Sequence, residues 1–535
     1  MTRNLADIFE AVVDAVPDRN ALYCEPRRLT YRELDERANR LAHHLTAQGV
    51  TAGDHVGCHL MNGTEYLETM LACFKIRAVP INVNYRYVEE ELRYLYDDAD
   101  LVATVVDAEF LDRVTALRDE LPLLKHLLVV RQPGDDEPTL GGDVVEYEEA
   151  LAASSPERGF PERSELDLMM IYTGGTTGFP KGVMWQHVDI FYAGMLGGNP
   201  TGEPCNSPAE VAARASQMPE LTSFPAAPLM HGAAELSSFI SFWAGFQVLL
   251  IRKYDGHGAL RLIEREKPIS MTVVGDAMVM PLIEALEEQD YDVSSLMQLG
   301  SAGAILSGAV RDRLRAFKPD INISDAYGAS EVGYTGGATE DSSPESGLKF
   351  KPNPRTRVID PDTLEIIEPG SDRVGRVAQR GHIPLGYYGD EEKTAATFVE
   401  VEGDRFVLLG DNARIDAEGV IHFLGRGSVC INSGGEKIFP EEVEAAIKSH
   451  PDIDDVIVAG VPDERWGQRV AAVIKPRRGA TAPTQEELAE HLGSRIARYK
   501  VPRLTVPVDS IQRSPSGKPD YKWARGVAEK AATSA

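Results

Sequence analysis

Residues 168–182 read Leu-Met-Met-Ile-Tyr-Thr-Gly-Gly-Thr-Thr-Gly-Phe-Pro-Lys-Gly, an apolar strand that runs directly into a loop of glycine and threonine. Glycine lets the backbone turn tightly and point its N–H groups at a ligand, and threonine hydroxyls add further donors. Lys181 adds a mobile cation at the end of the loop. Such a loop suits a polyphosphate whose charge must be held and later released. From composition alone, a flexible hairpin without a ligand is the competing interpretation.

The loop does not fit two widespread nucleotide-binding motifs. The pattern G-x-x-x-x-G-K-[ST] fails because Phe179-Pro180 precedes the lysine and Gly182 follows it. A G-x-G-x-x-G dinucleotide fingerprint does not follow any predicted strand. We therefore predict a phosphate-binding loop of a different class. Its candidate nucleotide-binding residues are Thr173, Gly174, Gly175, Thr176, Thr177, Gly178 and Lys181.

Outward from the loop, strand and helix patterns alternate along the chain. Thr30-Tyr-Arg-Glu33 is a capping box, and the apolar residues behind it lie on one helical face. Strands that alternate with helices favour a layered α/β architecture in which helices cover mostly parallel sheets. Further strands are predicted at 56–60, 101–106, 127–130, 269–274, 456–461 and 470–475, and helices at 65–74, 282–286, from Pro440 and around 486–496.

A second candidate segment is Asp-Ala-Tyr-Gly-Ala-Ser-Glu at residues 325–331. The ring of Tyr327 can stack on a base. Glu331 is a hard oxygen ligand suited to Mg²⁺, which usually takes one or two carboxylates together with phosphates. A turn with a solvated glutamate is the simpler alternative for this segment alone.

These motifs together resemble the acyl-activating, adenylate-forming enzyme superfamily, which includes acyl-CoA synthetases, beetle luciferases and the adenylation domains of peptide synthetases. The resemblance covers nearly the whole chain, and the loop is its most specific part. It implies an α/β adenylate-forming fold with a large layered α/β N-terminal domain, residues 1–426, and a small mobile α+β C-terminal domain, residues 427–535. The change from a turn-rich stretch to a compact segment near Gly425 agrees with this division.

The resemblance implies further nucleotide-binding residues. Asp411 and Arg426 match the pair that binds the ribose, although either residue alone is more often a surface charge. Glu331 and Thr173 are the implied metal ligands, and Thr176 is implied to act in catalysis with Glu331. Beyond the loop, the implied nucleotide-binding residues are Ala302, Gly303, Ala304, Asp325, Ala326, Tyr327, Gly328, Ala329 and Ser330.

Two lysines near the C-terminus carry the implied chemistry. Lys518, in Ser-Pro-Ser-Gly-Lys-Pro, matches the adenylation lysine, which touches both the carboxylate and the α-phosphate. Lys437, in Gly-Gly-Glu-Lys, matches a motif that faces the site while the thioester forms. A lysine in a C-terminal tail is usually solvated, so only the other motifs favour a catalytic Lys518. We expect the small domain to rotate about residues 426–429 between the two steps.

Small residues mark the acyl side of the predicted site. His231 aligns with the family's histidine, which orients the carboxylate or gates the acyl tunnel. The alternative is a structural histidine in the core whose ring nitrogens form hydrogen bonds within the protein. Gly275-Asp276 stands where a Val-Pro pair is common, so Asp276 is a candidate for acid choice. Small walls leave room for a long or polycyclic acid. The substrate-site candidates are His231, Gly232, Gly275, Asp276 and Gly303.

The bulk composition excludes several classes of protein. A net charge of −28 over 535 residues argues against a broad nucleic-acid-binding surface, which needs clustered Lys and Arg. The five cysteines contain no C-x-x-C pair, so we expect reduced thiols in a cytoplasmic protein rather than disulfides or structural zinc. The sequence has no apolar run of transmembrane length and no signal-peptide pattern at its start.

The sequence therefore predicts an enzyme that uses ATP, Mg²⁺ and coenzyme A to convert a small-molecule carboxylic acid, through its acyl-adenylate, into a thioester. The hinge reads Gly-Arg-Gly-Ser-Val at 425–429, without the charged pivot of many relatives. This hinge, the loop and Gly275-Asp276 make the chain similar to a bacterial subgroup that activates steroid side-chain and fatty acids. Transfer to a carrier protein or amine, and a non-enzymatic nucleotide-binding module, are the alternatives. A light-emitting monooxygenase would share the first step, but nothing points to luciferin, and a homodimer is compatible with all of these.

Overall fold

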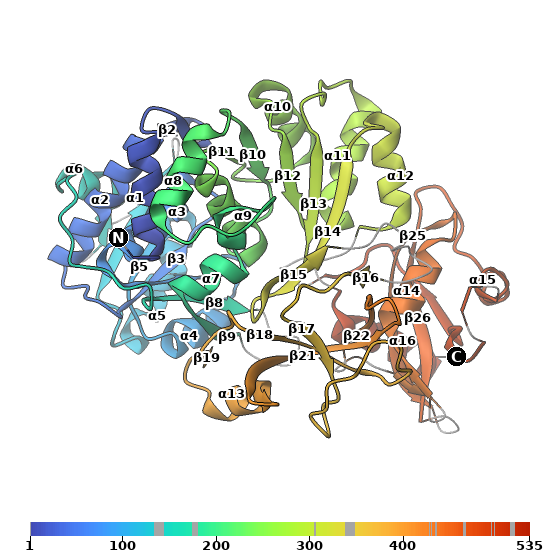
Figure 1. Ribbon diagram of the computed structural model, residues 1–535. Helices are drawn as coiled ribbons and strands as arrows, with labels where there is room; N and C mark the ends of the chain where they lie inside the picture. The colour runs from blue at the N-terminus through green and yellow to red at the C-terminus, as the bar shows by residue number, and fades with distance from the viewer. Residues whose placement is uncertain are drawn as a thin grey trace.

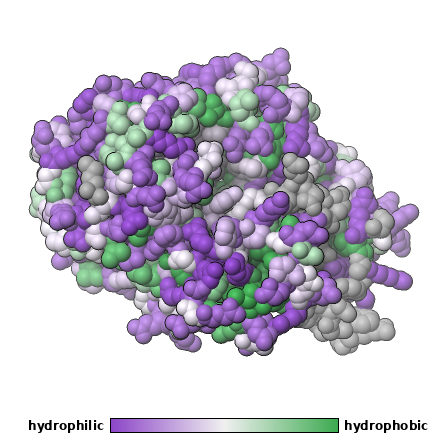
Figure 2. All heavy atoms as spheres, viewed as in Figure 1, coloured by the Kyte–Doolittle hydropathy of each residue, from purple (hydrophilic) through white to green (hydrophobic). Residues whose placement is uncertain are grey.

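The computed structural model describes residues 2–132, 144–173, 180–303, 306–337, 348–426, 429, 431–433, 436–463, 467–493, 495–496, 498–513 and 519–534. Within these ranges the strands form four sheets, which Figure 1 shows from the N-terminal half at the left to the small C-terminal part at the right. On the face drawn in Figure 2, hydrophilic residues predominate and hydrophobic residues lie in small separate patches. The described cysteines, Cys24, Cys58, Cys73 and Cys205, are buried free thiols.

The sheet that carries the glycine–threonine loop has eight strands in the order β19-β9-β8-β4-β3-β5-β6-β7. The strands from β8 to β7 run parallel, and β9 and β19 pair antiparallel at one edge. The members of this sheet are β3 (His55–His59), β4 (Val79–Asn82), β5 (Leu101–Asp107), β6 (His126–Val130), β7 (Val144–Glu146), β8 (Leu168–Thr173), β9 (Lys181–Gln186) and β19 (Gly386–Tyr387).

A second eight-stranded sheet has the order β15-β14-β13-β12-β10-β11-β1-β2. It too is parallel except at its edges, where β15 and β2 pair antiparallel. Its members are β1 (Asn20–Cys24), β2 (Arg27–Thr30), β10 (Thr222–Pro225), β11 (Gln247–Leu250), β12 (Ser270–Val273), β13 (Gln298–Ala302), β14 (Asn322–Ala329) and β15 (Gly333–Gly337).

Helices fill the space between these two sheets. Helix α3 (Thr64–Ile76) packs against β1 of one sheet and β3 and β4 of the other, and all of its residues are buried. Helix α2 (Tyr31–Ala47) begins at the predicted capping box. The other helices of residues 2–337 are α1 (Leu5–Ala15), α4 (Glu89–Asp98), η1 (Ala108–Phe110), α5 (Leu111–Leu117), η2 (Arg118–Glu120), α6 (Tyr147–Ala152), α7 (His187–Ala193), η3 (Leu196–Gly198), α8 (Pro208–Gln217), α9 (Gly232–Trp243), α10 (Gly256–Glu266), α11 (Asp276–Glu288) and α12 (Gly308–Phe317). Of these, α4 and α5 pack in a separate core with strands of the first sheet, and α10, α11 and α12 pack in another core with strands of the second.

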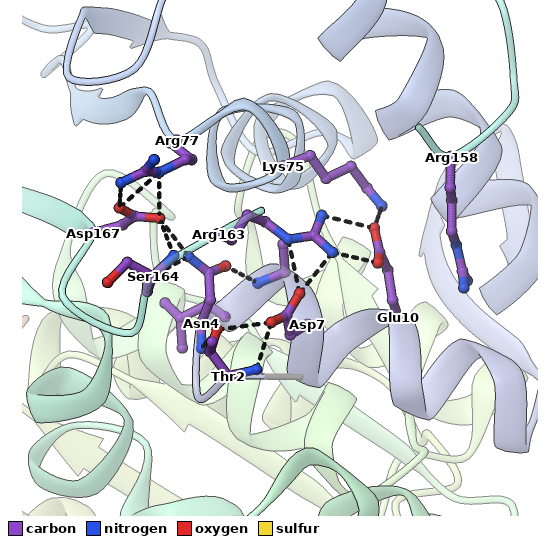
Figure 3. Close-up of polar contacts among 12 residues, drawn as sticks. Thr2, Asn4, Asp7, Glu10, Lys75, Arg77, Arg158, Arg163, Ser164 and Asp167 are labelled. Atoms are coloured by element: carbon purple, nitrogen blue, oxygen red, sulfur yellow. Dashed lines mark hydrogen bonds and ion pairs between the residues drawn. The ribbon is translucent and has the colours of Figure 1, made fainter. Parts of the chain in front are cut away.

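A buried ion network joins the first three helices. Lys75 of α3 is fully buried, and its Nζ lies 2.6 Å from Glu10 Oε1 of α1 and 2.7 Å from Asp35 Oδ1 of α2. Figure 3 shows Arg163 between Asp7 and Glu10, where it pairs with both carboxylates. Charged groups without water are stable only when they are paired and hydrogen-bonded. The network therefore fixes the helical layer to the segment that precedes β8.

The remaining strands form two smaller sheets. One is antiparallel and contains β16 (Lys349–Phe350), β17 (Thr356–Ile359), β18 (Gly375–Arg380), β20 (Phe398–Val401), β21 (Asp404–Ile415) and β22 (Ile421–Arg426), with α13 (Glu391–Thr397) beside it. The small C-terminal part contains β23 (Ile431–Ser433), β24 (Glu436–Ile438), α14 (Pro440–Lys448), β25 (Ile453–Asp463), β26 (Gly467–Pro476), α15 (Gln485–Leu492), η5 (Arg498–Lys500), β27 (Leu504–Pro507) and α16 (Tyr521–Ser534).

The predicted layered α/β architecture is confirmed, and each predicted helix and strand overlaps an observed one. The apolar side chains of β25 and β26 divide between two cores, one under α14 and α15 and one under α16. Helix α14 packs against β22, so the small part lies beside the antiparallel sheet (Figure 1).

Candidate functional site

The glycine–threonine loop connects two antiparallel neighbours. Thr173, the last residue of β8, pairs with Lys181, the first residue of β9. The ends of the loop are therefore held together by the sheet, as in a hairpin. The Lys181 ammonium lies 3.3 Å from the carboxylate of Asp390. The predicted loop residues Gly174, Gly175, Thr176, Thr177 and Gly178 lie outside the described residues.

The segment with Tyr327 lies along β14, beside β13. Ala302 pairs with Ala326, so two of the predicted nucleotide-binding segments are adjacent; Ala304 lies outside the described residues. The Tyr327 hydroxyl donates to Asp411 Oδ2 at 2.6 Å, which joins the predicted base-binding and ribose-binding residues. Phe350 stacks on the Tyr327 ring with the centroids 4.4 Å apart, and Tyr327 is buried, so its stacking on a base stays a prediction.

Two side chains from the loop's own sheet hold the turn after β14. The indole N–H of Trp185, on β9, donates to the carbonyl oxygen of Ser330 at 2.8 Å. The hydroxyl of Tyr387, on β19, donates to Glu331 Oε1 at 2.9 Å. Because β19 pairs with β9, these contacts place Glu331 near the strand that begins with Lys181.

Glu331 is suited to a hard cation. Its Oε1 is oriented by the Tyr387 hydroxyl, and a single carboxylate is enough for Mg²⁺ when phosphates supply the other ligands. Among the described residues, no three His, Cys, Asp or Glu side chains gather in a way that could hold a metal ion by themselves. Thr173, the other predicted ligand, ends β8.

Two residues of the Tyr327 motif have structural partners. The carboxylate of Asp325 is buried, forms an ion pair with Arg311 of α12, and accepts a hydrogen bond from the Leu306 N–H. A Cβ at Gly328 would approach the carbonyl oxygen of Gly333 within 2.3 Å. Glycine at this position therefore permits the close pairing of β14 with β15.

In the segments predicted to face the acid, two glycines leave methyl-sized spaces. His231 is half-buried and stands at the N-cap position of α9, where its side chain makes no capping hydrogen bond. A Cβ added at Gly232 would meet no heavy atom closer than 3.9 Å, and one added at Gly303 would also first meet a neighbour at 3.9 Å. Gly303 has φ +77°, a left-handed conformation that favours glycine.

Asp276 faces the small C-terminal part. Its Oδ1 accepts from the Ser307 N–H at 2.9 Å, and its Oδ2 lies 3.8 Å from Lys448 Nζ of α14. Gly275 before it has φ 62° and ψ −167°, a region that essentially only glycine occupies. The described contacts of Asp276 are thus with the start of α12 and with α14, and its role in acid choice stays a prediction.

The remaining predicted residues are placed only in part. Arg426 ends β22, where its backbone pairs with that of Asp411. Lys437 lies on β24, opposite Asn432. The side chains of Arg426 and Lys437, and the whole of Lys518, lie outside the described part of the chain.

Sequence reasoning missed three residues whose side chains hydrogen-bond to the predicted site segments or to residues next to them: Asn82, Trp185 and Tyr387. Asn82 and Trp185 bond to residues 90 and 145 positions away, and Tyr387 bonds to Glu331 across 56 positions. Only Asn82 gives a local signal, because it is a polar residue inside the apolar run Val-Pro-Ile-Asn-Val at 79–83.

Comparison with known proteins identifies the class. Residues 9–388 match the family described as AMP-binding enzyme, and residues 442–518 match the AMP-binding enzyme C-terminal domain. The chain belongs to the AMP-binding enzyme family. Across the residues that the structure describes, no helix combines the length and apolarity needed to cross a membrane.

Individual relatives are similar over their whole length. A 3-oxocholest-4-en-26-oate–CoA ligase of Rhodococcus rhodochrous is 46% identical, with 98% of this chain and 96% of the relative covered. A medium/long-chain-fatty-acid–CoA/3-oxocholest-4-en-26-oate–CoA ligase of Mycolicibacterium smegmatis is also 46% identical, over 99% of this chain and 97% of the relative. The crystal structure of the anthranilate CoA ligase AuaEII with anthranoyl-AMP has a TM-score of 0.84 at 22% identity, covering 99% of this chain and 98% of that chain, which confirms the adenylate-forming fold.

Proposed function

We propose that the protein is a carboxylic acid–CoA ligase that acts on medium- or long-chain fatty acids or on steroid side-chain acids. ATP would activate the acid as acyl-AMP with release of pyrophosphate, and coenzyme A would then displace AMP. The observation that carries this proposal is a pair of side-chain contacts around one segment: Tyr387, on the strand that pairs with β9, donates to Glu331, and Tyr327, four residues before Glu331, donates to Asp411. The ligase names of relatives that match along the entire chain support the same acids and the same acceptor.

The first step joins two anions, so the site must offset their repulsion. A carboxylate oxygen of the acid would attack the α-phosphorus of ATP, and the bond to pyrophosphate would break. When ATP binds, Lys181 would leave its ion pair with Asp390 and hold the phosphates that depart as pyrophosphate. Lys518 would stabilise the charge that develops at the α-phosphate. Glu331 and Thr173 would hold Mg²⁺, which would neutralise phosphate charge.

In the second step the thiol of coenzyme A attacks the acyl carbon, and the bond to AMP breaks. The two steps need different groups at one centre. Rotation of the small domain about residues 426–429 would replace Lys518 by the face that carries Lys437. The domain boundary after residue 426, a cytoplasmic location and a homodimer remain predictions.

A panel of carboxylic acids tests the proposal through pyrophosphate release, measured with and without coenzyme A. We expect kcat/KM for medium- and long-chain acids or a steroid side-chain acid to exceed that for acetate by at least about 100-fold, because each buried methylene adds binding energy. Acetate or propionate as the best substrate would contradict the assignment of the acid. Acylation of a carrier protein or amine in place of coenzyme A would favour the alternative acceptor.

A Tyr387→Phe variant tests the metal site. It removes the hydrogen bond to Glu331 but keeps the ring, so the carboxylate should be less well oriented. We expect the Mg²⁺ concentration that gives half-maximal pyrophosphate release to rise by about tenfold. Tyr388→Phe is the matched control, since the Tyr388 hydroxyl donates to the exposed Asp100 carboxylate at 2.7 Å instead. Equal Mg²⁺ dependence in the two variants would remove Tyr387 from this role.

A further inference from the structure

Asn82, the last residue of β4, has a buried side-chain amide that makes three hydrogen bonds. Its Nδ2 donates to the carbonyl oxygen of Tyr172 at 2.9 Å and to that of Met230 at 2.8 Å. Its Oδ1 accepts from the Tyr172 N–H at 2.7 Å. Both amide protons and the amide oxygen are thus engaged by main-chain groups of two separate segments.

The amide continues the sheet where the backbone pairing stops. Strands β4 and β8 pair in parallel at Ile81 and Met170. One residue later, the Asn82 side chain supplies the donor and the acceptor that a neighbouring backbone would have offered to Tyr172. The second amide proton leaves the sheet and reaches Met230.

The two residues that bind the Asn82 amide, Tyr172 and Met230, each lie next to one of the two predicted substrate-binding segments. Tyr172 precedes Thr173, where β8 ends and the glycine–threonine loop begins. Met230 precedes His231, which stands at the N-cap position of α9 in the predicted acid-binding segment. One amide therefore joins the strand that leads to the phosphates to the segment that faces the acid.

We propose that Asn82 is a positioning residue that sets the distance between the end of β8, from which the phosphate loop starts, and the acid-binding segment. This inference rests on the proposed function. It gives Asn82 no contact with either substrate and no part in proton transfer. Its effect falls on the first step, in which an oxygen of the acid must meet the α-phosphorus, because a displacement of about 1 Å can cost roughly 100-fold in rate.

Asn62 provides a matched control. It is also buried, its Nδ2 donates to the Ala227 carbonyl oxygen at 3.1 Å, and its Oδ1 accepts from the Leu229 N–H at 2.8 Å. It therefore holds the same segment that leads to His231, but its described side-chain bonds do not involve β8. Loss of either amide removes hydrogen bonds that hold the segment before His231 in place. Only loss of Asn82 also removes the link between that segment and β8.

The experiment compares Asn82→Ala, Asn82→Asp and Asn62→Ala in the full-length protein. Three quantities are measured: acid-dependent pyrophosphate release, thioester formation from chemically supplied acyl-adenylate, and the thermal unfolding midpoint. We expect the rate of pyrophosphate release by Asn82→Ala to fall about 30- to 100-fold. The fold-loss in thioester formation from supplied adenylate should be smaller than this loss by a factor of at least about ten. Asn82→Asp should show the same split, because it keeps the side-chain volume but an aspartate side chain cannot donate to two carbonyl groups at once.

Equal losses of pyrophosphate release in Asn82→Ala and Asn62→Ala, or equal losses in the two half-reactions, would overturn the inference. If Asn82→Ala does not fold, the same comparison is made with Asn82→Asp: a larger loss in pyrophosphate release than in thioester formation supports the inference, and equal losses overturn it. The proposed function has a separate outcome: if the wild-type protein releases no pyrophosphate with any acid, that function fails. Wild-type rates in a folded Asn82→Ala protein remove only the inference about Asn82.

Discussion

The Lys518→Ala protein is expected to release pyrophosphate about 100- to 1,000-fold more slowly than the wild type in the acid-dependent reaction. During adenylation, negative charge grows on the oxygens around the α-phosphorus, and a lysine held there stabilises the transition state more than the bound substrates. Removal of one such charge-stabilising donor typically costs this factor. The expectation rests on the Ser-Pro-Ser-Gly-Lys-Pro motif and on the family match, which ends at residue 518.

Thioester formation from chemically supplied acyl-adenylate separates a catalytic loss from a folding defect. In Lys518→Ala this second step should keep most of its rate, since pyrophosphate has already left. Lys437→Ala is the matched variant with the opposite expectation, a slower second step and a nearly normal first step. A Lys518→Ala protein that makes acyl-adenylate at the wild-type rate would refute the assignment.

The parts of the site that sequence alone predicts are those encoded in consecutive residues. A strand that runs into glycine and threonine predicts both β8 and the loop after it, and the capping box predicts the start of α2. The structure adds that β9 returns antiparallel, so the two ends of the loop are paired, and phosphate binding by the loop stays a prediction.

Contacts between distant strands were not predictable in this way. Tyr387 reaches Glu331 only because β19 adds to the edge of the loop's sheet, and this pairing joins positions about 200 residues apart. Likewise, Phe350 covers one face of Tyr327 because β16 lies across from β22 in another sheet. Such partners depend on the register of whole sheets, which no local pattern specifies.

Asp276 shows how a motif comparison can find a distinctive residue without finding its partner. The departure from Val-Pro identifies Gly275-Asp276 as unusual, and the φ of Gly275 explains why glycine is required there. The carboxylate contacts the Ser307 N–H and approaches Lys448, a residue of another domain in the predicted division. A contact across that division cannot be inferred from either segment separately.

Replacement of Lys75 by methionine is expected to lower the free energy of unfolding by about 3 kcal/mol at pH 7, because Glu10 and Asp35 lose their shared buried cation. The loss stays at the low end for a broken buried ion pair, since Glu10 keeps Arg163 and Asp35 keeps Arg158. Methionine fills a similar volume, so the loss reports the broken ion pairs more than a cavity. Denaturant unfolding measures it. The matched control is Arg93→Met, which breaks exposed pairs with Glu89 and Glu120 and should cost less than about 1 kcal/mol.

The pH dependence of this loss distinguishes an ion-pair effect from a packing effect. Burial raises the pKa of Glu10, but Lys75 and Arg163 outweigh it and hold the pKa at about 2, below the ordinary value of 4.5. The wild-type protein therefore has this stabilisation in full above pH 4.5 and loses it as the pH falls toward 2. Without Lys75 the pKa of Glu10 should rise, so the deficit of Lys75→Met should be largest near neutral pH and should shrink in acid. A deficit that is the same at about pH 3 and about pH 7 would instead assign the effect to packing around α3.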